Sequence, residues 1–182
     1  MQPENGDIQL QVNGSPVPLT GTGIIAPQLA TPVTCSITSG ETPTIDFGDV
    51  PLRTGADYTR TEGVQLAYRT QTISVSCDPQ PDDASPYTVS LKFYGDISQD
   101  YHTGRATKGA LVTGRSGLFI LPTSSQLSDD RIPINGDAVP MVPASANHYD
   151  LPVTWNLVGY SRNGKPDSGH FSATAMYTVT VE

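Results

Sequence analysis

The last fourteen residues of the chain, Gly169–Glu182, carry the pattern that restricts its fold most strongly. Apolar residues occupy every second position there, namely Phe171, Ala173, Ala175, Tyr177, Val179 and Val181. A period of two over eleven residues predicts a β-strand with one buried face. Such a strand needs a neighbour on each edge, or a covered edge. The sequence stops at Glu182, so we expect the second neighbour to come from elsewhere.

A second alternating segment lies near the other end of the chain. Ile8, Leu10 and Val12 alternate with Gln9, Gln11 and Asn13, and Gly14 follows. The pattern predicts a short strand. We expect this strand to be isolated, without a hairpin partner close by in the sequence.

The length of 182 residues predicts one domain, or one domain plus an arm. Sixteen Pro and seventeen Gly favour short strands and turns over helices. The formal charge of −8, with only 15% charged residues, argues against nucleic acid and anionic membranes as partners. No apolar run reaches the length of a transmembrane helix. Residues 1–6 lack the basic start and apolar stretch of a signal peptide.

Further strands are expected between turn-rich segments. The predicted strands cover 33–37, a continuation at 44–52, 64–77, 87–93, 117–122, 151–157 and 171–181. Asn135-Gly136 and Asn163-Gly164 are turn signals. Seven or eight short strands without a helix predict an all-β chain, an antiparallel β-sandwich of immunoglobulin-like type.

The two cysteines, Cys35 and Cys77, each lie in a strand-like run rich in Val, Ser and Thr. A pair on two strands suits a disulfide and an oxidising compartment. The alternative is two buried free thiols in a cytosolic protein. A zinc site is not expected, because there is no CxxC motif and no pair of histidines nearby.

No catalytic pattern is visible. His102, His148 and His170 are far apart and stand at no recognised catalytic spacing. The acidic pairs Asp82-Asp83 and Asp129-Asp130 lack the spacing of a calcium loop. The sequence therefore predicts no enzyme, no cofactor and no metal.

Four motifs together resemble the pilin subunits of chaperone–usher fimbriae, of the type 1 and P pilus kind. Asp7–Gly14 is similar to the family's donor-strand extension, and Cys35-Ser-Ile followed by Ile45-Asp-Phe-Gly-Asp-Val50 is similar to its first cysteine and the segment after it. Val75-Ser-Cys77 resembles the second cysteine, and Gly169–Ala175 resembles the C-terminal motif. The chain departs from the family in having Val181 next to last, where an aromatic residue is usual, and in the longer stretch from Gly14 to Cys35.

The resemblance implies an incomplete immunoglobulin-like β-sandwich that lacks its last strand. It implies an N-terminal donor-strand extension and linker at 1–20 and a pilin domain at 21–182. The donor residues would be Ile8, Leu10, Val12 and Gly14. The acceptor groove would be lined by Val33, Ile37, Phe171, Ala173, Ala175, Tyr177 and Val179.

The resemblance also implies partners and a location. A periplasmic chaperone would lend a strand to the groove, and at an outer-membrane usher the N-terminal segment of a neighbouring pilin subunit would replace it. The chain would become part of a fimbrium on the bacterial cell surface that serves in adhesion. Two alternatives stay open. The chain could be the pilin domain of a tip adhesin, or a secreted immunoglobulin-like binding domain that is complete or uses residues 7–14 to fill its own groove.

Overall fold

The computed structural model describes residues 10–12, 15–17, 32–39, 44–79, 87–98 and 109–182. By its internal contacts the chain divides into two units, Met1–Thr31 and Pro32–Glu182, called here the arm and the body. The described residues contain strands and no helix. Accordingly, the described part of the chain offers no helix with the length and apolarity that crossing a membrane requires.

The arm contains a β-hairpin. Strand β1 (Leu10–Val12) pairs antiparallel with β2 (Ser15–Val17), with Leu10 opposite Val17. The expectation that this segment has no hairpin partner is therefore wrong. The connection is Asn13-Gly14, the sequence that most often forms a two-residue hairpin loop. Among the predicted donor residues, Ile8 and Gly14 lie outside the described residues.

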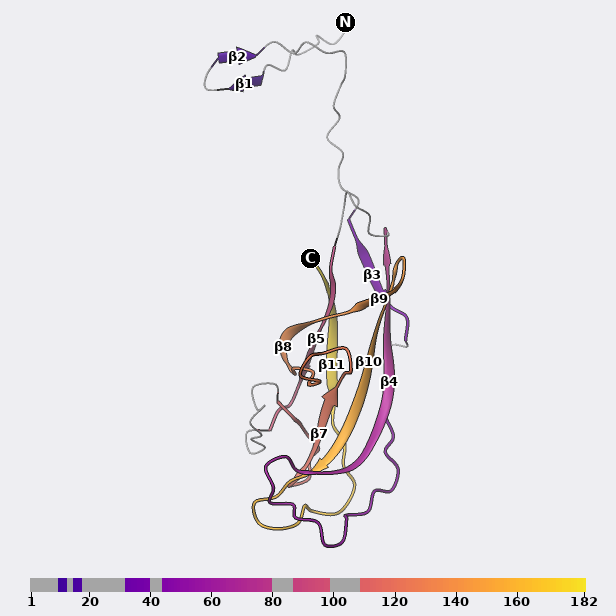
Figure 1. Cartoon of the computed structure of the whole chain (residues 1–182), viewed down its shortest axis with the longest axis vertical. Helices are drawn as coiled ribbons and strands as arrows, with labels where there is room; N and C mark the ends of the chain where they lie inside the picture. Colours follow the sequence, from indigo (N-terminus) through magenta and orange to yellow (C-terminus); the bar gives the residue numbers. More distant parts are fainter. Residues whose placement is uncertain (1–9, 13–14, 18–31, 40–43, 80–86, 99–108) are drawn as a thin grey trace, which may run out of the picture. The chain divides into compact units, whose positions relative to one another are not determined.

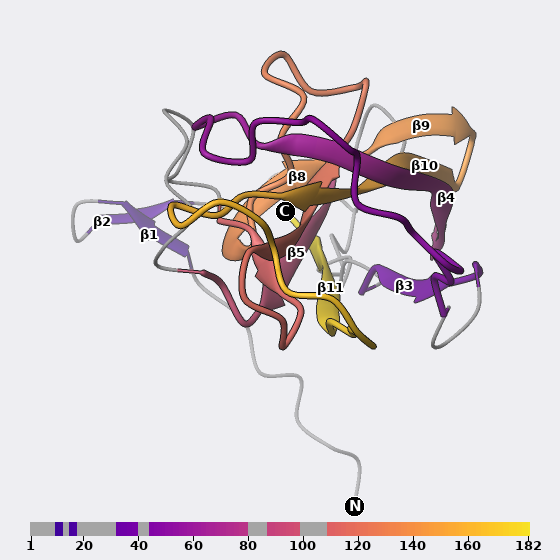
Figure 2. The ribbon, with the colours of Figure 1, turned by 90° about the horizontal axis from the view of Figure 1, so that it is seen from below.

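The body is a sandwich of two antiparallel sheets (Figure 1). The first has the order β3-β4-β10-β7-β6, and β9 also pairs with β10; its strands are β3 (Thr34–Ile37), β4 (Val64–Asp78), β6 (Leu111–Val112), β7 (Leu118–Thr123), β9 (Val142–Ser145) and β10 (His148–Gly159). The second has the order β11-β5-β8, with β5 (Val89–Gly95), β8 (Asn135–Pro140) and β11 (Ala175–Val181). Figure 2, which looks along the body, shows β4 and β10 in one layer and β5 and β11 in the other.

The core lies between the sheets and is built from alternating rows. The buried residues of three strands form its centre: Ile73, Val75 and Cys77 of β4, Val89, Leu91 and Phe93 of β5, and Leu151, Val153 and Leu157 of β10. Strand β7 is buried on both faces, as its continuous apolar run predicts, because Ile120 joins this core while Phe119 and Leu121 join a second cluster with Val158.

Three local expectations were wrong. Residues 44–52 form no strand. The C-terminal strand begins at Ala175 and not at Phe171. Asn135-Gly136 lies at the start of β8 and makes no hairpin turn. Opposite it, the register between β5 and β8 shifts between Lys92 and Tyr94, and Gly136 has a φ of 88°. This is a β-bulge, which uses the same glycine freedom that a turn uses. The turn at Asn163-Gly164 is confirmed.

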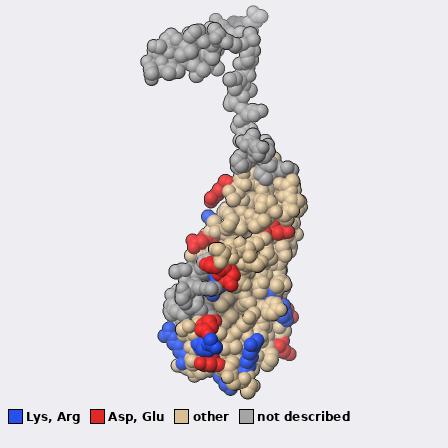
Figure 3. All heavy atoms as spheres, viewed as in Figure 1, with Lys and Arg blue, Asp and Glu red and all other residues tan. Residues whose placement is uncertain are grey.

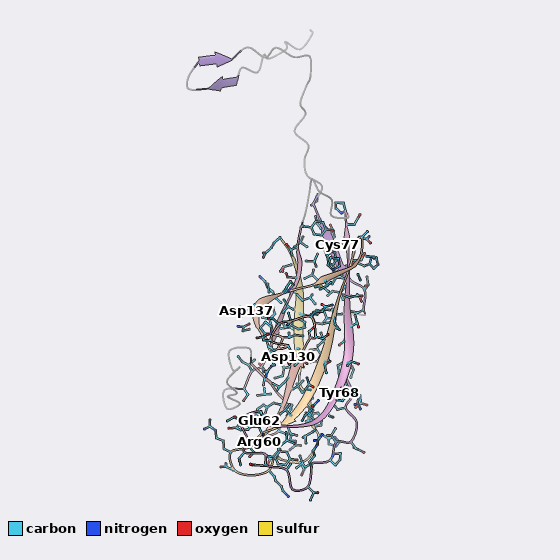
Figure 4. The ribbon with its side chains drawn as sticks, in the orientation of Figure 1. Arg60, Glu62, Tyr68, Cys77, Asp130 and Asp137 are labelled. Atoms are coloured by element: carbon cyan, nitrogen blue, oxygen red, sulfur yellow. A yellow bond between two sulfur atoms is a disulfide. The ribbon has the colours of Figure 1, made fainter. Side chains whose placement is uncertain are left out.

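The two cysteines form a disulfide, as expected, with Cα atoms 4.1 Å apart. They stand directly opposite each other on β3 and β4. The Cys77 amide donates to Asn147 O on the far side of β4. The cysteines therefore form a non-hydrogen-bonded pair, in which facing side chains approach most closely. Figure 4 shows Cys77 in the upper part of the body.

Removing the disulfide should destabilise the body. The bond closes a loop over a sequence separation of 42 residues, so the loss of loop-closure entropy predicts a fall in the free energy of unfolding of about 4 kcal/mol for Cys35→Ala with Cys77→Ala. Urea denaturation measures this value. Reducing the wild-type chain should shift the midpoint equally, and an unchanged midpoint in the double variant would contradict the prediction.

Candidate functional site

An apolar groove of about 1770 Å³ runs beside β11 in the body. One wall consists of residues 167–178, and the other consists of Ile37 and residues 44–52. Buried apolar side chains from β6, β7 and β10 form the floor: Leu111, Leu118, Ile120, Trp155 and Leu157. The groove thus opens directly onto the main core.

The edge of β11 that faces this groove has no strand beside it, since β11 is the end strand of its sheet in the described part of the chain. Thr88 and Glu182 exchange two backbone hydrogen bonds, which fixes the phase of the β5–β11 ladder. In an antiparallel pair the bonded residues alternate. The N–H and C=O groups of Ala175, Tyr177, Val179 and Val181 therefore point away from β5, toward the open edge.

The inward row of this wall is only partly covered. Phe171, Ala173, Ala175, Tyr177 and Val179 are half-buried and pack against the core. By contrast, Leu91 and Phe93, which pair with the same strand, are fully buried. The difference shows that the row on β11 has core on one side and no cover on the other. Within the half-buried row, Phe171, Ala173, Ala175 and Tyr177 line the groove, and Val179 does not.

The opposite wall begins at β3. Thr38 donates to Ser74 O, so the backbone groups of Cys35 and Ile37 point away from β4 by the same alternation. Ile37 lines the groove and is 37% exposed. Val33, which was also expected there, packs against the core but does not line the groove.

Sequence reasoning missed most of the second wall and the whole floor. Ile45, Phe47 and Val50 line the wall although residues 44–52 form no strand. The floor residues come from β6, β7 and β10, which are distant in sequence. Their apolar character was visible in the sequence, but only the packing of the sheets shows that they meet below one groove.

An aromatic contact joins the two walls. The rings of Phe47 and Phe171 lie with their centroids 6.1 Å apart, one from each wall. The segment before β11 is held from another side, because Ser172 N donates to Thr113 O and Arg115 Nε donates to His170 O. At Gly169, with a φ of 122°, a Cβ atom would lie 2.9 Å from Arg115 Cζ. These contacts explain why the ladder with β5 starts only at Ala175.

Two polar groups near the groove bear on how it is filled. Trp155 Nε1 donates to Gln71 Oε1 at 3.2 Å. The hydroxyl of Tyr177 is buried and finds no hydrogen-bond partner among the described residues. No group of three His, Cys, Asp or Glu side chains that could hold a metal occurs within the described ranges.

The charged side chains lie largely outside the groove. On the face shown in Figure 3, Lys and Arg gather at the lower end of the body, whereas Asp and Glu are spread along it.

Beyond the groove, burial raises the pKa of Tyr87, and Tyr149 beside it adds to this shift. Tyr87 therefore stays neutral and donates its hydroxyl proton to Pro79 O at 2.7 Å.

The groove as a whole is an apolar channel beside an unpaired strand edge. A site of this kind can bind an extended peptide strand.

Replacing Tyr177 by Phe should stabilise the chain with an empty groove by about 1 kcal/mol, because it removes a buried hydroxyl without a partner. Tyr58 supplies the matched control. It is 1% exposed, and its hydroxyl accepts a bond from Arg53 N at 2.6 Å, so Tyr58→Phe should destabilise. Urea unfolding of both variants tests the pair, and a loss of stability in Tyr177→Phe would refute the assignment.

Comparison with known proteins gives matches only at the level of structure. No family model matches the sequence. No curated protein matches it either.

The chain resembles several solved structures, and two of them illustrate the likeness. The crystal structure of the P pilus rod subunit PapA has a TM-score of 0.58 and 20% identity, and covers 81% of this chain and 99% of its own. A chaperone–usher pilus structure concerned with rod uncoiling also has a TM-score of 0.58, with 19% identity, and covers 100% of this chain and 99% of its own. The chain therefore has the incomplete immunoglobulin-like fold of chaperone–usher pilus subunits, which confirms at the level of fold the resemblance seen in its sequence motifs.

Proposed function

We propose that the chain is a structural subunit of a surface fimbria that is assembled by donor-strand exchange. The observation that carries this proposal is the open edge of β11 above an apolar groove. Both solved structures compared above are of chaperone–usher or P pili, and they share the fold. The role is that of a building block and not of an enzyme.

The empty groove is costly to leave uncovered. Each unpaired backbone group that loses water without gaining a partner costs on the order of 1–3 kcal/mol. An exposed strand edge beside apolar side chains also invites association with other chains. A strand from another chain removes both costs at once by completing the ladder and covering the row. Chaperone–pilin donor-strand complementation is itself an established case of such strand addition.

The strand to be donated is the alternating segment of the arm. Burying Ile8, Leu10 and Val12 in the groove of a neighbouring subunit would contribute roughly 5–9 kcal/mol before ordering costs. Gly14 would fit where the two backbones approach closely. In the groove this segment would pair with a wall on each of its two edges. Leu10–Val12 must therefore first separate from β2, which occupies one of those edges.

Each subunit would then donate with its N-terminal extension, residues 1–20, and accept with its pilin domain, residues 21–182. A head-to-tail contact of this kind does not close on itself and builds a filament. Before assembly, a strand of a periplasmic chaperone would fill the groove, and an outer-membrane usher would be the place of exchange. The disulfide suits the oxidising periplasm on this route to the cell surface.

Leu10→Asp should block assembly, because a carboxylate would enter the apolar groove without a partner. Binding of the chaperone should persist, since the chaperone uses the acceptor groove and not the donor segment. Electron microscopy of filaments and co-purification with the chaperone measure the two effects.

Gln11→Asp is the matched control, because Gln11 alternates with the apolar row and its side chain would face away from the groove. Its filaments should be normal. Unaltered filaments in Leu10→Asp would sink the donor assignment and leave the alternatives, a tip-adhesin domain or a self-filled groove, to be tested.

Deleting residues 1–14 should give a chain that accepts a strand but cannot donate one. Without chaperone or added peptide it should have a low melting temperature, because its groove stays open. A synthetic peptide of residues 4–17 should raise that temperature by mass action. A deletion variant that is a stable monomer with a high melting temperature, indifferent to the peptide, would argue for a domain complete in itself.

A further inference from the structure

The groove wall formed by residues 44–52 has an unusual means of support. No backbone hydrogen bond joins this segment to a strand in the described part of the chain. An edge segment without a ladder is normally free to open. Its position therefore depends on side chains, and one arginine donates two hydrogen bonds to its backbone.

Arg69 of β4 reaches this wall with its guanidinium group. Its Nε donates to Asp46 O at 2.9 Å, and its Nη2 donates to Phe47 O at 3.0 Å. The remaining nitrogen, Nη1, donates to Tyr68 O at 2.9 Å. The planar fork thus connects strand β4 to two consecutive carbonyl groups of the wall.

Two neighbouring carbonyl groups point to opposite sides in an extended chain, so their common contact with Arg69 requires a bend at this point. The local sequence stabilises that bend. Gly48 N donates to Asp46 Oδ1 at 2.8 Å, and Gly48 has a φ of 65°. A Cβ atom at Gly48 would meet nothing within 4 Å, so the glycine is needed for its backbone angle and not for space.

The bend directs the ring of Phe47 into the body. Phe47 is 7% exposed. The guanidinium carbon of Arg69 lies 6.0 Å from the centroid of the Phe47 ring. The centroid of the Phe171 ring, on the other wall, lies 6.1 Å from the same centroid. Arg69 therefore fixes the residue through which one wall contacts the other.

We propose that Arg69 is a positioning residue of the groove: it holds the Asp46–Gly48 bend in the strand-accepting conformation while the groove is empty. This inference rests on the proposed function, because the bound strand is the donor segment. Once a strand lies in the groove, its own backbone bonds hold the wall. Arg69 thus acts mainly on the free state.

The expected change in peptide affinity follows from the fraction of free molecules in which the wall is already formed. If the wall is formed in only a fraction of free molecules, the apparent Kd rises in inverse proportion to that fraction. Lysine keeps the charge but lacks the planar fork that meets two carbonyl groups together. Arg69→Lys should therefore rescue Arg69→Met only in part.

The test uses the full-length chain with Leu10→Asp as the parent, so that it accepts a strand but does not assemble. The probe is a synthetic peptide of residues 4–17 with the wild-type sequence. Trp155, the single tryptophan, lines the groove and reports binding by fluorescence. Arg60→Met is the matched control, since Arg60 pairs with Glu62 at the lower end of the body, as Figure 4 shows.

Arg69→Met should raise the apparent Kd by ~10–100-fold, mostly by slower association, with a dissociation rate within about twofold of the parent. Hydrogen exchange should be faster at residues 45–49 in the free variant and return to the parent's rate with peptide bound. Arg60→Met should behave as the parent.

Two results would overturn the inference while the proposed function stands. The first is equal peptide affinity in the parent and in Arg69→Met. The second is faster hydrogen exchange in free Arg69→Met throughout β5 and β10 as well as at residues 45–49, since this would mean a loss of stability in the whole body. A parent that binds no peptide would overturn the proposed function together with the inference.

Discussion

The open edge of β11 is the feature on which the rest of the body depends. A strand with an inward apolar row and four residues whose backbone groups point to one side is stable only with a neighbour there. The groove, the half-buried row and the resemblance to pilus subunits are consequences of that one missing neighbour. The disulfide and the Arg69 contacts lie on the opposite wall and keep it in place although no strand joins the two walls.

The body keeps a packed centre in spite of the gap. Ile73, Leu91, Phe93 and Leu151, from β4, β5 and β10, are fully buried without an added strand. Many of the half-buried apolar residues that pack against this core line the groove, namely Ile45, Val50, Leu66, Phe171, Ala173, Ala175 and Tyr177. An added strand would therefore complete the cover of a core that is already formed. It would not be needed to create that core. This division is what a subunit requires if one strand is to be replaced by another without unfolding of the whole sandwich.

The sequence allowed the fold class and much of one wall to be predicted, because period-two alternation reports directly which side chains face inward. It placed Phe171, Ala173, Ala175 and Tyr177 in the row that lines the groove. It failed at residues 44–52, where alternating apolar residues form a wall without a strand, because side chains and not a ladder hold the segment. The floor could not be predicted either, since Leu111, Ile120 and Trp155 meet only through the order of the sheets.

The arm adds a constraint of its own. Pro16 has no N–H group to donate, so it suits a non-hydrogen-bonded pair with Gln11. The hydrogen bonds of the hairpin are then restricted to the pairs on either side, Leu10 with Val17 and Val12 with Ser15. An isolated two-stranded hairpin is at best marginally stable. If β1 is the donated strand, as proposed, a groove that offers it two edges and an apolar floor would outcompete β2, so the segment could be paired before assembly and still be available for it.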